Sequence, residues 1–450
     1  MDEVLRRPEV EILATRFPRP VLVGVVRRAI EDRRSRILAG EKVSDLDPPA
    51  GEIERLAVDA LRPSLRRVVN ATGVVIHTNL GRAPLPASSL EALGSFAGRY
   101  SNLEYDLARG RRGSRYDHVN ALLAEVIGAE AAHVVNNNAA ALLLASSALA
   151  RGREIVVSRG ELIEIGDGFR IPDVIREGGA VLREVGTTNR TRLADYEEAV
   201  RDATAVIAKI HRSNFFQEGF TEEASVADLA PLARRAGLVL LHDAGSGVLG
   251  LPGTLGEHAE PALGDALREG ADLVTASGDK ALGGPQAGII AGRRDLVDLL
   301  RRHPMTRALR PCKLTLGILH HVLTLYRDGR MDEIPVWRML GADPEALRAR
   351  ARKLARRLRA VPGLSALVGS EVSRVGGGAL PRLELTTWVV RLRHELLSSD
   401  ALEERLRSAE VPVVARIARG EVVLDMRTVG DDELSLILSA LKPAVPGGCY

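Results

Sequence analysis

Between residues 68 and 310, short apolar runs recur between longer segments with helical periodicity. Polar residues hardly alternate with the apolar ones in these runs, which is typical of strands buried on both faces of a parallel sheet. Helical segments such as Val119–Ile127 and Ser225–Ala236 separate the runs. The pattern therefore predicts an α/β domain with a largely parallel sheet. Its predicted strands are His133–Val135, Glu154–Val157, Val181–Val185, Ala205–Ile210, Leu238–Leu241, Leu273–Thr275 and Gly288–Ala291.

The chain has 450 residues, too many for one simple core, and the segments that flank the α/β pattern differ from it. Pro20–Ala39 has apolar residues at helical spacing and an arginine-rich opposite face, and Glu52–Leu61 indicates a second helix. Near the other end, Asp343 and Pro344 are placed to begin a helix that runs to about Arg359. Strands are expected at Leu383–Leu392, Pro412–Ile417 and Glu421–Met426, and helices near Asp400–Ala409 and Asp431–Leu441.

These patterns predict three domains. Residues 1–62 form a helical N-terminal domain, residues 63–330 the large α/β domain, and residues 331–450 a small C-terminal α+β domain.

Composition excludes several classes of protein. No apolar stretch reaches the roughly 18 residues that a membrane-spanning helix needs, and the N-terminus lacks a signal-peptide core, so we expect a cytoplasmic protein without a membrane partner. The two cysteines, Cys312 and Cys449, are too few for a disulfide framework or a cysteine zinc site, and no metal site is predicted. Net charge is only +3, and residues 1–60 hold 11 basic and 12 acidic residues. Charge therefore does not indicate a nucleic-acid partner.

Two segments after predicted strands have residues that suit a phosphorylated cofactor. Asn136–Ala141 follows the first strand, and small or amide side chains there leave backbone N–H groups free for a phosphate at a helix N-terminus. Asp243 follows another apolar strand, where a carboxylate can pair with the protonated nitrogen of a pyridine ring. Taken singly, Asn136–Ala141 is better explained by ordinary capping of a helix, and Asp243 is equally compatible with capping of a turn.

Two further segments have reactive or anion-binding side chains. Lys280 lies in the small-residue string Thr275–Pro285, where a lysine can form a Schiff base with an aldehyde and glycines admit bulky groups. Arg307, Arg310 and Lys313 could clamp an oxyanion, although a solvated basic turn is the simpler alternative in an arginine-rich chain. The joint occurrence of all four features in this order favours a pyridoxal-phosphate (PLP) site.

Long strings of the sequence resemble bacterial selenocysteine synthase, the L-seryl-tRNA(Sec) selenium transferase family, and the resemblance covers nearly the whole chain. It departs from the family at Pro311–Cys312 and at Asp167, where a second glycine is commoner. The strings that carry the resemblance are Arg67–Arg82, Ser101–Leu107, Gly110–Arg115, the run from Asn136, Ser158–Glu161, Phe169–Pro172, Val185–Asn189 and the segments around Asp243, Lys280 and Arg307.

The resemblance implies a fold-type I PLP-dependent transferase, with a mostly parallel sheet in the large domain, a small C-terminal α+β domain and a helical N-terminal domain that grips tRNA. It implies that Lys280 carries the cofactor and that Asp243 faces the pyridine nitrogen. Arg82, Arg307 and Arg310 would bind the selenium donor, selenophosphate. The residues expected to bind the cofactor with Lys280 and Asp243 are Asn137, Asn138, Ala139 and Ser277.

The expected activity is the conversion of seryl-tRNA(Sec) to selenocysteyl-tRNA(Sec) through a PLP-bound aminoacrylyl-tRNA, with Lys280 taking the α-proton. The family assembles as a ring of dimers, which implies a homodecamer. One alternative is a PLP-dependent lyase that acts on a small amino acid or a sugar amino acid phosphate. Another is a tRNA-binding protein without activity, although Lys280 and Asp243 speak against it.

Overall fold

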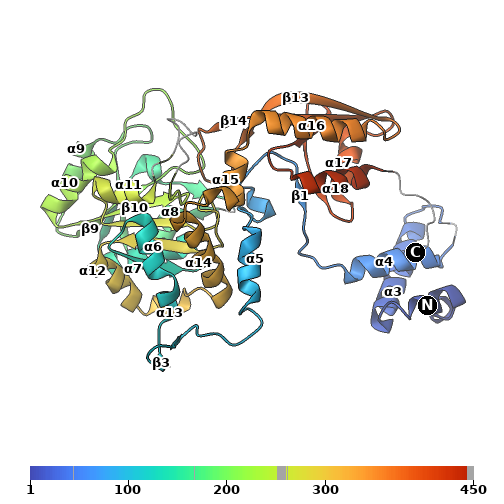
Figure 1. Cartoon of the computed structure of the whole chain (residues 1–450), viewed down its shortest axis with the longest axis horizontal. Coiled ribbons are helices and arrows are strands. Elements are labelled where there is room, and N and C mark those ends of the chain that lie inside the picture. The colour runs from blue at the N-terminus through green and yellow to red at the C-terminus, as the bar shows by residue number, and fades with distance from the viewer. Residues whose placement is uncertain (44, 167, 251–259, 261, 443–450) are drawn as a thin grey trace. The chain divides into compact units, whose positions relative to one another are not determined.

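A computed structural model describes residues 1–43, 45–166, 168–250, 260 and 262–442 (Figure 1). Asp167 and Cys449 lie outside the described residues. The chain divides into two compact units, Met1–Arg67 and Val68–Tyr450. The second unit includes both the predicted large domain and the predicted C-terminal domain.

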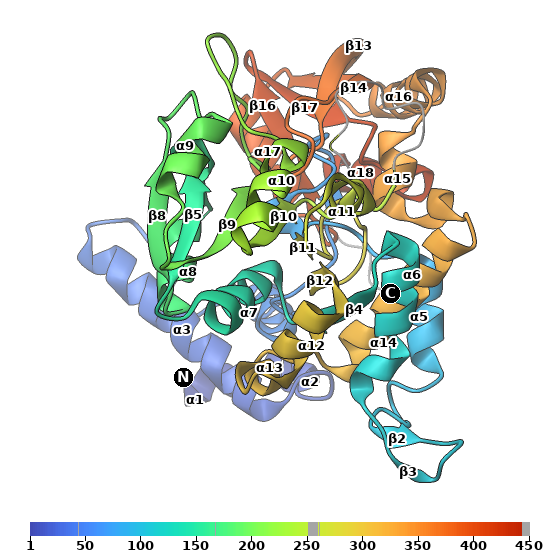
Figure 2. The same ribbon diagram turned by 90° about the vertical axis from the view of Figure 1, so that its left-hand side faces the viewer.

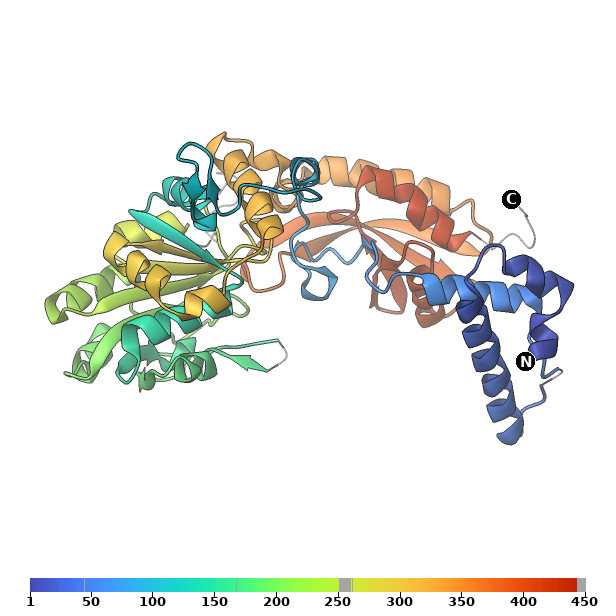
Figure 3. The ribbon, with the colours of Figure 1, turned by 90° about the horizontal axis from the view of Figure 1, so that it is seen from below.

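The first unit is helical, as the sequence predicts. Its helices are α1 (Asp2–Leu5), α2 (Pro8–Leu13), α3 (Arg19–Leu38) and α4 (Ala50–Leu61). The long α3 crosses α4. In Figure 3, α3 is dark blue and α4 is lighter blue. Apolar residues of all four helices form one small core, centred on Val26 and Ile53, which are fully buried. The ion pair between Arg33 and Glu52 joins the two longer helices at its edge.

A seven-stranded sheet is the centre of the second unit. From one edge to the other the strands are β4 (Ala131–Val135), β12 (Gly288–Gly292), β11 (Leu273–Ser277), β10 (Val239–Gly245), β9 (Thr204–Ile210), β5 (Glu154–Ser158) and β8 (Val181–Val185). All neighbours pair in parallel except β12, which runs antiparallel to β11 and to β4. The seven predicted strands are confirmed, with ends that differ by a few residues.

Helices cover both faces of this sheet, which explains why its strands are apolar on both sides. One face packs on α7 (Asn138–Ala150), α8 (Ile171–Glu177) and α12 (Arg294–Arg302). The opposite face packs on α6 (Asn120–Ile127), α10 (Val226–Ala236), α11 (Leu263–Glu269) and α14 (Lys313–Arg327). Figure 2 shows the sheet between these layers. The remaining α-helices among the described residues from 68 to 342 are α5 (Ala87–Gly94), α9 (Leu193–Ala199), α13 (Met305–Ala308) and α15 (Pro335–Leu340).

A four-stranded antiparallel sheet forms the C-terminal part. Its order is β13 (Leu364–Arg374), β14 (Glu384–His394), β17 (Glu421–Asp425) and β16 (Arg416–Ala418). Residues of α16 (Pro344–Leu358), α17 (Ser399–Arg407) and α18 (Leu434–Leu441) share its core. The Asp343 side chain caps α16, as predicted, by accepting the Glu345 N–H. The predicted strand Pro412–Ile417 is wrong in one respect, because it divides into β15 (Val413–Val414) and β16.

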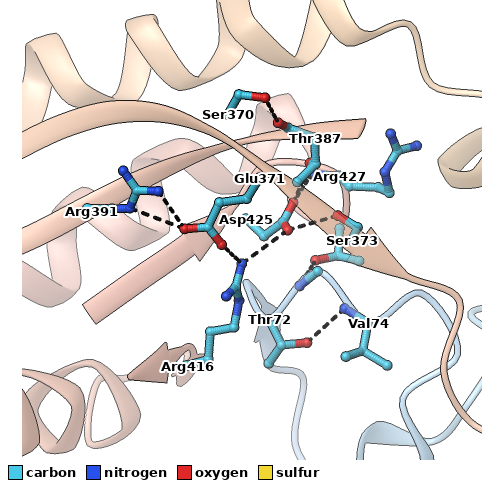
Figure 4. Close-up of polar contacts among 12 residues, drawn as sticks. Thr72, Val74, Ser370, Glu371, Ser373, Thr387, Arg391, Arg416, Asp425 and Arg427 are labelled. Carbon is cyan, nitrogen blue, oxygen red and sulfur yellow. Dashed lines mark hydrogen bonds and ion pairs between the residues drawn. The ribbon is translucent and has the colours of Figure 1, made fainter. Parts of the chain in front are cut away.

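The segment after the first unit packs against this C-terminal sheet and forms a separate two-stranded sheet there. β1 (Val69–Asn70) pairs in parallel with β15, and Val69 and Ala71 lie in the C-terminal core. The buried Asp425 carboxylate lies against Gly73, at whose position any Cβ would collide with it. Figure 4 shows Ser373 and Thr387 donating to the same carboxylate. The chain between Asn70 and Arg82 is therefore held by the C-terminal sheet before it reaches the large domain.

Candidate active site

The carboxyl ends of three neighbouring parallel strands bring the predicted site residues together. β9 ends at Ile210, β10 at Gly245 and β11 at Ser277, and the strands are adjacent in the sheet. Ligands of open α/β sheets bind at this edge because the loops that follow the strands converge there. Asp243 lies near the end of β10, and Lys280 follows β11. The side chain of Asn138, at the N-terminus of α7, donates to Asp243, so this helix end lies at the same edge.

Asp243 is held in a defined orientation on β10. The Asn138 side-chain amide donates to its Oδ1 at 2.8 Å, and the Gly245 N–H donates to the same oxygen at 3.1 Å. Burial raises the pKa of the Asp243 carboxyl, while these hydrogen bonds favour its ionised form. A cation placed against the carboxylate would stabilise the ionised form further. The protonated ring nitrogen of PLP is such a cation, and Asp243 therefore fits that role.

Lys280 lies in a turn after β11 and is only 5% exposed. Burial lowers the pKa of its amine, the Arg82 guanidinium acts in the same direction, and the carboxylates of Asp243 and Asp279 oppose the shift. A lowered pKa increases the fraction of neutral amine, the form that attacks an aldehyde or removes a proton.

Small residues fold the turn around Lys280 tightly. The Gly283 N–H donates to the Lys280 carbonyl at 2.9 Å, and the Gly284 N–H donates to Gly278 at 2.8 Å. A Cβ at Gly278 would lie 2.7 Å from the Pro285 carbonyl oxygen. The glycines in this string are therefore required by the packing of the turn itself, and they fix where the lysine side chain begins.

The N-terminus of α7 suits a phosphate. Asn137 caps the helix by accepting the Ala140 N–H at 2.8 Å, and the two residues that follow, Asn138 and Ala139, begin its first turn. N–H groups of a first helical turn have no partner within the helix and favour an anion through the helix dipole. Asn138 thus connects this end of the helix to Asp243, so that one ligand could contact both. Ser277 is buried at the end of β11, and no contact of its hydroxyl with a described residue supports a specific role.

Arg82 reaches the same edge from the segment that the C-terminal sheet holds. It donates to Asp279 Oδ2 at 2.8 Å, directly beside Lys280 in the chain, and the Ala83 N–H donates to the Asp279 carbonyl at 3.2 Å. The backbone of Arg82 has a φ of 61°. This backbone conformation is unfavourable for a residue other than glycine. The contacts around Arg82 therefore hold its backbone in this conformation.

Arg307 and Arg310 lie in another group of cations. Both are exposed and line a pocket of about 480 Å³ together with Arg112, Arg115 and Arg301. Glu104 pairs with Arg115 at 2.6 Å and lies 3.8 Å from Arg310. No contact joins Arg307 or Arg310 to Lys280 within the described part of the chain. The link to the cofactor edge is indirect, because the Asn136 N–H donates to the carbonyl of Leu309, between the two arginines.

The sequence did not indicate three residues near Lys280. Gly378 of the C-terminal part approaches Lys280 Nζ, and Ser213, after β9, lies beside the same glycine. Glu260 Oε1 accepts the Leu380 N–H at 2.5 Å and lies 2.9 Å from His211 Nε2. Only the run Gly376–Gly378 was a visible signal for any of them, because three consecutive glycines favour an unusual turn.

A buried lysine beside a carboxylate, with a helix N-terminus at the same edge of a mostly parallel sheet, defines a fold-type I PLP-dependent enzyme. The family model described as L-seryl-tRNA selenium transferase matches residues 68–430, and the model described as selenocysteine synthase N terminal matches residues 1–34. The chain belongs to the L-seryl-tRNA selenium transferase family, as its resemblance implies, and both family and fold imply PLP as the cofactor.

Relatives of the family are similar over almost the full length. The L-seryl-tRNA(Sec) selenium transferase of Geobacter sulfurreducens is 50% identical over 98% of this chain and 97% of its own length. The enzyme of the same name from Aquifex aeolicus is 46% identical over 96% of each chain. The solved structure of D-glucosaminate-6-phosphate ammonia-lyase has a TM-score of 0.59 and 23% identity over 86% of this chain and 96% of its own. That likeness supports the fold alone.

The described residues were also expected to lack a membrane-spanning helix and a metal site. None of the helices there is long and apolar enough to cross a membrane. Among those same residues, no group of three or more histidine, cysteine, aspartate or glutamate side chains is arranged to hold a metal ion.

Proposed function

We propose that this chain converts seryl-tRNA(Sec) to selenocysteyl-tRNA(Sec) with PLP as cofactor and selenophosphate as selenium donor. The observation that carries the proposal is the buried Lys280 next to Asp243, in a chain that belongs to the L-seryl-tRNA selenium transferase family over residues 68–430. A protein that binds tRNA without catalysis has no need for a buried amine of lowered pKa.

Lys280, Asp243 and the first turn of α7 are the proposed holders of the cofactor. Lys280 Nζ would hold the aldehyde end of PLP, Asp243 would face its ring nitrogen, and the N–H groups of Asn138 and Ala139 would hold its phosphate. When bound, PLP withdraws electrons from the substrate Cα, which makes the Cα proton removable. Asn138 has a second function in this arrangement, because its amide fixes the Asp243 carboxylate from the helix end.

Lys280 is also the proposed base. With PLP and the seryl group bound, its neutral Nζ would take the Cα proton of the seryl group. Burial lowers the pKa of the amine, which favours its neutral form, and the Arg82 guanidinium acts in the same direction. The salt bridge between Arg82 and Asp279 sets the distance of that guanidinium from Lys280.

Arg82, Arg307 and Arg310 are the proposed binders of selenophosphate. Guanidinium groups bind phosphate oxygens in a bidentate manner, and the pocket that contains Arg307 and Arg310 is rich in such groups. Because no contact joins this pocket to Arg82 among the described residues of one chain, we propose that a second subunit completes the donor site. The exposed Tyr100 and Leu107, which flank the pocket residue Glu104 in sequence, support self-association, and a ring of five dimers is the proposed assembly.

The first unit is the proposed tRNA-binding domain. Its longest helix, α3, presents Arg27, Arg28 and Arg34 to solvent, and none of them forms an ion pair with a described residue. Unpaired arginines on one helix suit the phosphates of an RNA backbone, whatever the net charge of the unit. The proposed site of action is the cytoplasm.

The test is the conversion itself. Purified protein with PLP, seryl-tRNA(Sec) and selenophosphate should form selenocysteyl-tRNA, which is measured by mass spectrometry of the esterified amino acid. Lys280→Ala should abolish the product and retain tRNA binding. Lys353→Ala, a change at a half-exposed lysine of the C-terminal part, should retain both. Product formation by Lys280→Ala would refute the role of the lysine, while turnover of a sugar amino acid phosphate but not of seryl-tRNA would favour the lyase.

A further inference from the structure

Half of the chain's phenylalanines lie in one exposed segment that follows β9. The chain has six phenylalanines, and three of them, Phe215, Phe216 and Phe220, lie within six residues of one another. Their exposed fractions are 37%, 44% and 75%. Aromatic rings in water forgo the free energy that burial would give them, and clusters of exposed rings mark interaction surfaces. Residues 211–223, here called the phenylalanine segment, are therefore a candidate binding surface.

Side-chain amides hold the backbone of the phenylalanine segment in place. The Gln217 amide donates to the Thr188 carbonyl at 3.0 Å, and the Asn189 amide donates to the Phe220 carbonyl at 2.6 Å. A surface that is already ordered loses less conformational entropy on binding than a loose loop does. The rings are thus presented from a defined backbone.

Two arginines lie against these rings. The guanidinium carbon of Arg382 is 5.8 Å from the centre of the Phe216 ring. That of Arg190 is 4.2 Å from the centre of the Phe220 ring. Arg190 pairs with Glu222, whereas Arg382 is exposed and forms no ion pair with any described residue. Arg382 is therefore a cation beside an aromatic ring that is available to an anion from outside.

A pocket of about 410 Å³ adjoins the first part of the phenylalanine segment. Its volume is within the roughly 300–1,000 Å³ typical of sites for small organic groups. Glu260 in its wall is only 7% exposed, and its Oε2 finds no hydrogen-bond donor among the described residues. The pocket thus combines aromatic rings, a cation and an unused acceptor. Its lining includes His211, Arg212, Phe215, Phe216, Glu260 and Arg382.

The phenylalanine segment also passes the cofactor lysine. A Cβ placed on Gly378 would lie 2.9 Å from Lys280 Nζ and 3.3 Å from Ser213 Oγ, so Ser213 and Lys280 face one small space. In the chain, Ser213 lies between the pocket residues Arg212 and Phe215. The pocket therefore lies next to the space in which Lys280 acts.

The proposed substrate places a nucleotide close to this space. Only the carbonyl carbon and the ester oxygen separate Cα of a seryl group from the terminal ribose of its RNA. When Cα lies at Lys280 Nζ, the terminal nucleotide must therefore lie near the lysine as well. Unpaired nucleotides bind proteins through bases that stack on aromatic rings and through phosphates that contact basic side chains. The phenylalanine segment and Arg382 offer both kinds of contact.

We propose that the phenylalanine segment and Arg382 dock the unpaired nucleotides at the aminoacylated end of the substrate RNA. Phe216 stacks on a base, Arg382 contacts the adjoining phosphate, and Glu260 Oε2 accepts a hydrogen bond from the terminal nucleoside. The inference rests on the proposed function and deepens it by naming the residues that receive the end of the RNA nearest the reacting atom.

The first experiment compares kcat/KM for seryl-tRNA(Sec) among variants of the PLP-loaded full chain. Phe216→Leu removes the ring but keeps an apolar side chain, and Arg382→Ala removes the cation. Each should lower kcat/KM by about tenfold or more, the effect of one lost base stack or phosphate contact, while the cofactor absorption stays unchanged. Phe216→Trp retains an aromatic ring and should keep the wild-type value. Arg352→Ala is the matched control, because Arg352 is an exposed arginine of α16 without an ion pair among the described residues.

The second experiment locates the end of the RNA without turnover. A tRNA(Sec) whose terminal adenosine carries an aryl azide is irradiated with the wild type, and the crosslinked peptides are identified by mass spectrometry. We expect the label on residues 211–223, and a label elsewhere would overturn the docking site.

Equal kcat/KM values for the wild type, Phe216→Leu and Arg382→Ala would also overturn it. So would a change in the oligomeric state of Phe216→Leu, measured by sedimentation, because the phenylalanine segment would then contact a second copy of the chain. Failure of the wild type to form selenocysteyl-tRNA would instead refute the proposed function, which the crosslink does not require.

Discussion

The buried Asp425 offers a quantitative test of how the C-terminal sheet holds the segment that leads to Arg82. Its carboxylate is fully buried and accepts hydrogen bonds from Ser373 Oγ at 2.8 Å, from Thr387 Oγ1 at 2.7 Å and from the Arg427 N–H at 3.0 Å. Asp425→Ala leaves these three buried donors without their acceptor. At about 1–3 kcal/mol for each unpaired buried group, and with hydroxyls able to rotate, we expect a loss of about 3 kcal/mol or more.

Urea unfolding followed by circular dichroism measures this loss, and Thr387→Val provides the comparison. Thr387→Val replaces one hydroxyl donor with a methyl group of similar shape, so it should lower the unfolding free energy by only about 1 kcal/mol. The double variant should cost about 1 kcal/mol less than the sum of the single changes, since Thr387 no longer has a hydroxyl to leave unpaired. A loss below 1 kcal/mol for Asp425→Ala, or full additivity, would refute the assigned network.

Three further predictions concern separate parts of the chain. Removal of residues 1–62 deletes all four helices of the first unit, and it should abolish tRNA binding in a filter assay while the cofactor absorption remains; unchanged affinity would contradict the assignment. Arg310→Ala should retain cofactor binding and block selenium transfer, and normal transfer would exclude Arg310 from the donor site. Burial lowers the pKa of His133 to about 3 from 6.5, so its stabilising neutral form is fully favoured above pH 6.5 and its contribution is lost as pH falls towards 3. Between pH 7 and 5 the unfolding free energy of His133→Phe should therefore fall by about 2 kcal/mol less than that of the wild type, and an equal fall would contradict the burial of a neutral imidazole.

The strands of the large sheet could be predicted because each is an apolar run bounded by turns, but β13 could not. Burial along Leu364–Arg374 follows no regular alternation, since Ser373 is buried while Leu367 and Val372 are exposed, and the strand forms an edge of the C-terminal sheet. Such an edge strand has few apolar residues to distinguish it from a loop. The division of Pro412–Ile417 into two strands depends on two different partners: β15 pairs with β1, which lies far away in sequence, and β16 pairs with the neighbouring β17.

The candidate site likewise contains residues that could be predicted from the sequence and residues that could not. Asp243, Lys280 and Asn138 follow strands or open a helix at one edge of the sheet, so the order of elements was enough to predict that they meet. Ser213 and Gly378 become neighbours of Lys280 only through the packing of the C-terminal part, which no local pattern encodes. The roles given to Arg307 and Arg310 stay predictions, since their pocket lies apart from Lys280 in the single chain.

The most direct test of the central claim is the near-visible absorption of the purified, PLP-loaded protein before and after addition of seryl-tRNA(Sec). We predict a cofactor band that depends on Lys280, that changes with seryl-tRNA(Sec) and that does not change with free serine. A band that is unaffected by the tRNA but responds to small amino acids, or the absence of any band after incubation with PLP, would contradict the account.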